Sequence, residues 1–338
     1  MGSTTEPDER IHALIVEGRL DEAERLIEGL KRRAPKASET LAYAGLLAYE
    51  RDELEDARVS LEASIAADPS WAYPRAWLAE LDLVEGYPRA AIARIDEALP
   101  LLASPRLAVS LHFTAAEAAF ELGARALVAD RLGRIERVEG LEADTWAMLA
   151  SAWLDLGDPS RAERAAREGL ALSEPSLESD LWYLLGRAAD LHGNADLRSE
   201  AWLKVRSLDL VAPRPAFALD EDEAVAIATE AFDALPDEAQ RHLANLPILI
   251  ADSPSEALVL EGVDPRLLGL FSGTMLKDKS HLEGGLSGPD NATLYIRNIE
   301  RVSASRAELI EQIRITLWHE TAHYFGLEDD ALEAIGLG

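Results

Sequence analysis

The stretch WAMLASAWLDLGDPSRA (residues 146–162) decides the fold of the larger part of the chain. Its apolar residues are spaced as on one face of a helix, and Gly157 then marks a turn before a second helical pattern begins. The same arrangement returns with a period near 34 residues. One turn residue marks each unit, and these residues are Asp52, Gly86, Gly123, Gly157 and Gly193. The first two thirds of the chain are therefore predicted to form consecutive helical hairpins.

The repeated unit resembles the tetratricopeptide repeat, a helix–turn–helix motif with small and large residues at fixed offsets. Small residues allow the two helices of a unit to approach closely, and here they are Gly45, Ala150 and Gly186. Large residues fill the space between units, and here they are Leu41, Trp146 and Trp182. Each unit leaves one apolar face uncovered, so the resemblance implies a stacked α-solenoid.

Five repeat units are clear, and a partial unit precedes them at residues 8–34. The third unit, at 109–142, departs from the pattern because His112 and Val128 occupy signature positions. The tryptophans of the repeats are expected to form core between units. If the concave groove binds anything, the acidic surplus of the chain favours a protein or peptide partner of basic character.

A composition shift follows the repeats, where two prolines interrupt the helical pattern near residue 212. Beyond it, alternating patterns predict helices and short strands. The predicted helices cover 221–233, entered through Asp220 or Glu221, and 304–325, with Ser303 or Ser305 as N-cap. The predicted strands lie within 245–251, 267–275 and 292–297, and residues 277–290 read as an exposed loop. We therefore expect a mainly α chain, with a repeat domain at 1–211 and a small α+β domain at 212–338.

The long helix predicted near the C-terminus carries the motif His319-Glu320-Thr321-Ala322-His323, of the form H-E-x-x-H. Two histidines four residues apart lie about one turn apart on a helix, so both imidazoles can face one metal ion. Glu320 points to the side, where it can accept a proton from metal-bound water. The spacing predicts His319 and His323 as metal ligands and Glu320 as the general base, with zinc the favoured metal.

The third ligand follows by elimination. Few residues remain after His323, so a glutamate from a distant helix is excluded, and all three methionines precede the motif, so a Met-turn is excluded. Gly326 can end the helix and let the chain return towards the metal. Asp329, which stands where a third histidine occurs in H-E-x-x-H-x-x-G-x-x-H proteins, is the preferred ligand. Asp330 comes next, followed by Glu328 or Glu333.

The block from about 221 to 338 resembles the minimal zincin-like metallopeptidases. The resemblance rests on Ala231–Pro236, Asn245–Pro247, Gly269–Gly273, Leu294–Arg297 and above all Thr316–Asp330. It implies a short α+β core in which the H-E-x-x-H helix lies beneath a small sheet. It also implies that His319, His323 and Asp329 hold zinc and that Glu320 is the base.

Composition excludes several other classes. The chain has 338 residues with 33 Lys+Arg against 62 Asp+Glu, a net charge of −29. A phosphate backbone or an anionic membrane surface would repel such a chain, so we expect no nucleic-acid or membrane partner. With no cysteine, disulfides and thiol nucleophiles are excluded. No signal sequence or apolar run of roughly 18–20 residues occurs, and we expect a cytoplasmic protein.

Two hypotheses of different class follow from the sequence. The first is a zinc-dependent peptidase-like hydrolase whose repeat domain recruits a protein partner or substrate. The second is a non-enzymatic adaptor, in which the repeats bind a partner and the zincin-like core is degenerate or inactive.

Overall fold

The structure is a computed structural model, and it describes residues 9–102, 104–235, 240–241, 246–272 and 291–324. The chain forms two compact units. The first comprises Met1–Glu142 and Ala152–Asp158, and the second comprises Ala143–Ser151 and Pro159–Gly338. No helix in the described ranges combines the length and apolar character that a membrane crossing requires.

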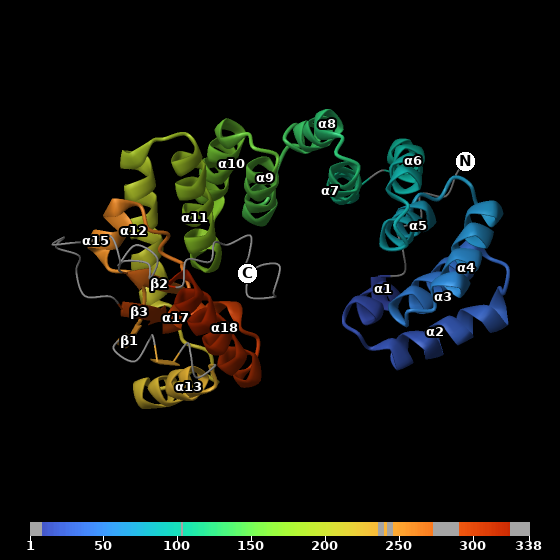
Figure 1. Cartoon of the computed structure of the whole chain (residues 1–338). Coiled ribbons are helices and arrows are strands. Elements are labelled where there is room, and N and C mark those ends of the chain that lie inside the picture. Colours follow the sequence, from blue (N-terminus) through green and yellow to red (C-terminus); the bar gives the residue numbers. More distant parts are fainter. Residues whose placement is uncertain (1–8, 103, 236–239, 242–245, 273–290, 325–338) are drawn as a thin grey trace. The chain divides into compact units, whose positions relative to one another are not determined.

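Residues 9–211 fold into consecutive helices joined by short turns (Figure 1). In the first unit the hairpins are α1 (Glu9–Val16) with α2 (Leu20–Arg33), α3 (Ser38–Glu50) with α4 (Leu54–Ala67), α5 (Tyr73–Val84) with α6 (Pro88–Ala98), and α7 (Pro105–Glu121) with α8 (Arg125–Ile135). Next come α9 (Ala143–Asp155), α10 (Pro159–Leu172), α11 (Pro175–Leu191) and α12 (Ala195–Val211). The predicted mainly α, repeat-like N-terminal part is confirmed, including the partial first unit.

Close helix approach inside the hairpins depends on the small residues. A Cβ at Gly45 on α3 would lie 2.8 Å from Leu61 Cγ on α4. A Cβ at Gly186 on α11 would lie 2.1 Å from Trp202 Cδ1 on α12. Real Cβ contacts are longer than this, so glycine sets the distance between the paired helices at both positions.

The turn between paired helices uses a left-handed residue at regular intervals. The φ angles lie between +64° and +78° at Gly18, Gly86, Gly123, Gly157 and Gly193. Asp52 takes this position in the second hairpin with φ +62°, and it is the only residue other than glycine with positive φ in the described ranges. A side chain makes this conformation less favourable, although aspartate tolerates it better than most residues.

Replacing Asp52 with glycine is therefore expected to raise the free energy of unfolding by about 0.5–1 kcal/mol. The reciprocal change Gly86→Asp should lower it by a similar amount, because no atom of the described residues lies within 4 Å of a Cβ there and the change therefore tests only the backbone. Urea unfolding followed by circular dichroism measures both. A loss of stability in Asp52→Gly would contradict this account of the turn.

The third hairpin departs from the repeat pattern at His112 on α7, as the sequence indicates. The side chain is buried at 9% exposure, and within the described residues its Nδ1 has no hydrogen-bond partner. Burial lowers the pKa of His112, and the nearby Arg131 guanidinium lowers it further. The folded state therefore favours the neutral imidazole, and its contribution to stability is lost as pH falls below the ordinary histidine pKa of 6.5.

The pKa of Glu80 on α5 is raised, whereas that of His112 is lowered. Burial raises its pKa to about 7, and the negative charge of Glu50 at the end of α3 adds to the shift. A raised carboxyl pKa stabilises the fold fully below the ordinary value of 4.5, and this contribution is lost as pH rises through about 7.

Glu80→Gln should accordingly be more stable than the wild-type chain at pH 8, by roughly 2 kcal/mol, and nearly equal to it at pH 4.5. Urea unfolding of both proteins across this pH range gives the difference in their free energies of unfolding. The pH dependence that His112 contributes is the same in both proteins and does not affect this difference. Glu117→Gln, an exposed position on α7, is the matched control. A difference that does not change with pH would refute the buried-carboxyl explanation.

The C-terminal part of the second unit is α+β, as predicted. Its elements are α13 (Glu221–Asp233), β1 (Ile248–Ala251), α15 (Glu256–Glu261), β2 (Gly269–Ser272), β3 (Asn291–Tyr295), α17 (Ile296–Val302) and α18 (Arg306–Tyr324). The sheet order is β1-β3-β2, with β1 parallel and β2 antiparallel to β3. Helices α13 and α18 contact each other and the sheet, and apolar residues such as Leu294, Ile313 and Leu317 form the shared core.

Helix starts follow the sequence signals. The Asp220 carboxylate accepts from the Glu223 N–H at 2.8 Å, and the Glu223 carboxylate accepts from the Asp220 N–H at 3.1 Å, which makes a capping box for α13. Ser305 accepts from the Glu308 N–H before α18. The predicted third strand ends earlier than expected, at Tyr295, because α17 begins at once and buries Asn298 and Glu300. The loop predicted at 277–290 lies outside the described residues.

Candidate active site

The motif residues lie on the last turns of α18, the helix predicted to carry them. His319 is partly exposed, whereas Glu320 and Thr321 are buried. His323 follows one turn later in the same helix, and its side chain lies outside the described part of the structure. Trp318 donates from Nε1 to the Ala231 carbonyl at 3.0 Å, which fastens this end of α18 to α13.

The Glu320 carboxylate reaches strand β2. Its Oε2 accepts a hydrogen bond from the Phe271 backbone N–H at 2.6 Å, and the side chain is only 7% exposed. Gly269 on the same strand leaves the space for it, since a Cβ there would lie 2.8 Å from Glu320 Cγ and 2.7 Å from Thr316 Cγ2. A charge-assisted bond of this length fixes the carboxylate on one side of the helix.

The Phe271 N–H is available because of the register of the sheet. Tyr295 N–H donates to the Leu268 carbonyl at 2.8 Å, and Gly269 then pairs with Leu294. Since antiparallel residues alternate between facing the partner strand and facing away, Phe271 directs its N–H away from β3. Strand β2 thus presents backbone groups to α18 along its outer edge.

Tyr295, at the end of β3, is a titratable group close enough to Glu320 to feel its charge. The side chain is 2% exposed. Burial raises the pKa of its hydroxyl, and the negative charge of Glu320 raises it further. The hydroxyl therefore stays protonated at neutral pH and remains a hydrogen-bond donor.

The predicted metal ligands lie partly outside the described residues. Among the residues that the structure describes, no group of three or more potential ligand side chains comes together. Asp329, Asp330 and Gly326 lie outside the described residues, as does the His323 side chain. The donor set still fits zinc in kind, because two imidazoles with a carboxylate suit that ion. Glu320, predicted as the base and not as a ligand, is bound to β2.

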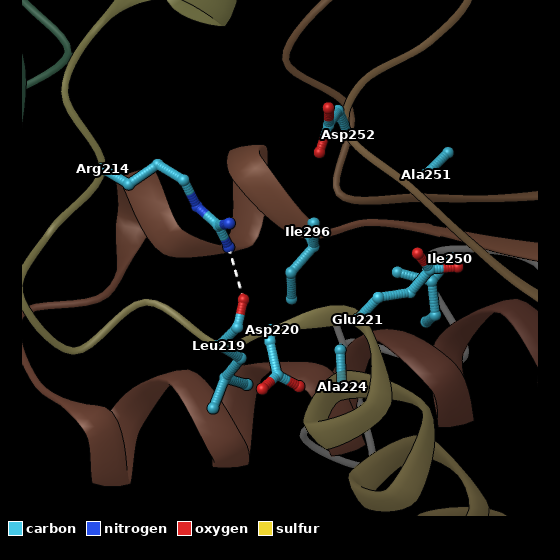
Figure 2. A pocket seen from close by; sticks show the side chains of 9 residues that line it. All are labelled: Arg214, Leu219, Asp220, Glu221, Ala224, Ile250, Ala251, Asp252 and Ile296. Atoms are coloured by element: carbon cyan, nitrogen blue, oxygen red, sulfur yellow. Dashed lines mark hydrogen bonds between the residues drawn. The ribbon is translucent and has the colours of Figure 1, made fainter.

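A pocket of about 340 Å³ opens elsewhere in the second unit (Figure 2). Its described lining residues come from the segment before α13, from α13 itself, from the end of β1 and the residue after it, and from the start of α17. None of them belongs to the motif. Arg214 spans one wall, donating to the Leu219 carbonyl at 2.6 Å and pairing with the buried Glu300. With its guanidinium engaged, Arg214 serves here as a structural residue.

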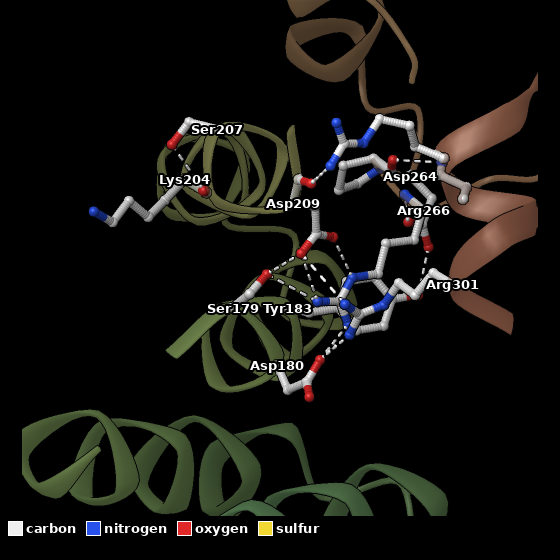
Figure 3. Close-up of polar contacts among 12 residues, drawn as sticks. Ser179, Asp180, Tyr183, Lys204, Ser207, Asp209, Asp264, Arg266 and Arg301 are labelled. Carbon is white, nitrogen blue, oxygen red and sulfur yellow. Dashed lines mark hydrogen bonds and ion pairs between the residues drawn. The ribbon is translucent and has the colours of Figure 1, made fainter. Parts of the chain in front are cut away.

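A second polar cluster was not predicted from the sequence. Residues from α11 and α12 meet the segment before β2 and the helix α17 in a set of ion pairs and hydrogen bonds (Figure 3). The members are Ser179, Asp180, Tyr183, Asp209, Asp264, Arg266 and Arg301. Charged residues are common throughout this chain, so no sequence signal distinguishes these from solvated ones.

Comparison with known proteins finds similarities for two parts of the chain. Residues 243–338 match the model of the zincin-like metallopeptidase family. The C-terminal part of a tetratricopeptide-repeat-containing protein from Cytophaga hutchinsonii has a similar fold, with a TM-score of 0.50 at 12% identity, covering 67% of this chain and 86% of that one. PilF from Pseudomonas aeruginosa aligns with a TM-score of 0.49 at 12% identity, covering 60% of this chain and 90% of that one. No curated protein matches the chain in sequence.

The chain therefore carries a small zincin-like domain that follows a tetratricopeptide-repeat-like α-solenoid. Residues 243–338 are similar to zincin-like metallopeptidases, and the repeat part shares its fold with a tetratricopeptide-repeat-containing protein. Activity, metal and partner are matters of proposal.

Proposed function

We propose that the protein is a zinc-dependent peptidase-like hydrolase whose solenoid recruits a protein partner or substrate. The observation that carries the proposal is the buried Glu320 carboxylate, held by the Phe271 N–H of an edge strand within an H-E-x-x-H helix. A carboxylate fixed beside, and not on, the histidine positions is what a general base requires.

The proposed ligands are His319, His323 and Asp329, which leave one coordination position for water. Bound zinc would polarise the substrate carbonyl and make water easier to deprotonate at neutral pH. Glu320 would take a proton from the attacking water and then deliver it to the leaving amine.

The geometry of strand β2 suits the binding of a peptide substrate. Among the described strands β2 lies at the edge of the sheet, and an extended peptide can pair with backbone groups of such an edge other than the Phe271 N–H, which Glu320 already binds. Pairing would lay a peptide carbonyl along the strand, near the carboxylate. The buried Tyr295 hydroxyl, which remains protonated, is a neighbouring donor within the same layer.

The solenoid is proposed to supply recognition, since stacked hairpins offer an extended concave surface. The net charge of −29 favours a protein or peptide of basic character.

The test is incubation of the zinc-loaded full chain with a broad peptide library, with new termini identified by mass spectrometry. We expect cleavage that stops on chelation and returns when zinc is added. An intact library under all conditions would favour the adaptor hypothesis and contradict the proposed hydrolase.

A further inference from the structure

We propose that Arg266 is a positioning residue of the zincin-like domain. Anchored on the last helical hairpin, α11 and α12, it holds the segment that leads into β2, and through β2 it fixes the place of the Glu320 carboxylate. The proposal deepens the hydrolase function and rests on it for its catalytic meaning.

Arg266 connects the two helices directly. Its Nε donates to Asp209 Oδ2 on α12 at 2.9 Å, and its Nη1 pairs with Asp180 Oδ1 on α11 at 2.8 Å. Its Nη2 donates to Ser179 Oγ at 2.9 Å, and the guanidinium lies 4.6 Å from the centre of the Tyr183 ring. The Arg266 side chain is 12% exposed and Asp209 is 15% exposed, so the bond between them is largely shielded from water, whereas Asp180 is 43% exposed.

The segment around Arg266 is tied down at both ends. Before it, Asp264 accepts from the Tyr183 hydroxyl at 2.7 Å and from the Arg266 N–H at 2.8 Å. On either side of it, the Pro265 and Leu267 carbonyls accept from the buried Asn298 of α17 at 2.9 and 2.7 Å. The chain has little freedom between α11 and the start of β2.

Strand β2 links the restrained segment around Arg266 to the candidate site. It begins at Gly269, two residues beyond Leu267, and its Phe271 N–H binds Glu320. A shift of the strand along its own axis would move that donor and take Gly269 away from Thr316 and Glu320, where a residue with a Cβ does not fit. The position of the carboxylate thus depends on contacts made by helices that the sequence assigns to the repeats.

Arg301 completes the arrangement from α17. It also pairs with Asp180 and with Asp209 (Figure 3). Two arginines and two aspartates therefore join α11, α12, the segment before β2 and α17. Such a network restrains relative movement better than a single surface pair, since loss of one bond leaves the others in place. The last hairpin would then be an integral part of the hydrolase fold as well as the last repeat.

The test is amide hydrogen exchange on the full chain carrying Arg266→Gln. Peptides that cover residues 267–271 and the last turns of α18 should exchange about tenfold faster, because β2 loses its anchor while the remaining structure stays closed. Arg167→Gln, an exposed intrahelical pair on α10, is the matched control and should change neither region. Unchanged exchange in β2 and α18 would overturn the proposal.

Arg266→Lys keeps the charge but cannot bridge the same partners, so it should loosen β2 to a smaller degree. If Arg266→Gln unfolds the second unit, Arg266→Lys tests the positioning role in its place. Faster exchange confined to β2 and α18 supports the proposal, and unchanged exchange in both refutes it. Where hydrolysis is found, kcat should fall more than KM rises. Looser β2 without any hydrolysis in the wild type would leave the positioning role intact and refute the proposed function.

Discussion

Glu320→Gln is expected to lower kcat/KM for peptide cleavage by about 10³-fold while leaving the fold intact. Glutamine has the same shape, and its amide oxygen can still accept the Phe271 N–H that binds Glu320 at 2.6 Å. It cannot take a proton from water at neutral pH. The substitution therefore removes proton transfer and little else.

Glu311→Gln supplies the control for this experiment, because it makes the same change on an exposed face of the same helix, α18. Steady-state rates are measured on zinc-loaded proteins whose circular dichroism spectra coincide. Activity of Glu320→Gln within about twofold of wild type would mean that another group accepts the proton.

Gly186→Ala is expected to give the largest loss of stability, about 3 kcal/mol. The added Cβ would lie 2.1 Å from Trp202 Cδ1, and Trp202 is 4% exposed, so neither helix of the pair can yield without disturbing the core. Urea unfolding measures the change. Trp202→Leu combined with Gly186→Ala should recover part of the loss, because the smaller side chain leaves room for the methyl group.

Gly29→Ala tests whether this loss comes from contact and not from removing a helical glycine. Gly29 lies within α2, and a Cβ there would meet only Arg33 Nη2, at 3.9 Å. Alanine favours the helix at such a site, so this variant should gain about 0.5–1 kcal/mol. Effects of the same sign at the two positions would contradict the packing explanation.

Much of the fold could be predicted because its signals are local. The turn residues, with Asp52 among them, recur at regular intervals, and each adopts the left-handed conformation that the hairpin needs. The cap at Asp220 and the long helix α18 follow from short-range patterns of the same kind. Helix α17 was missed because its start directly after Tyr295 reflects burial of Asn298 and Glu300 by distant segments.

The candidate site could be predicted only to the level of its motif. Spacing on a helix identifies His319, Glu320 and His323, but the bond from Phe271 joins positions 49 residues apart. The Arg266 cluster is harder still, since Asp180 and Asp209 lie in the repeats and nothing in their local sequence distinguishes them. The position of Asp329 as third ligand stays a prediction, because it lies outside the described residues.

The most direct test of the central claim, that α18 holds a catalytic zinc ion, is the metal content of protein purified without chelator. We predict about one zinc ion per chain in the wild type and in Glu320→Gln, and almost none in His319→Ala. Wild-type protein that binds no zinc, or His319→Ala that retains it fully, would contradict the claim.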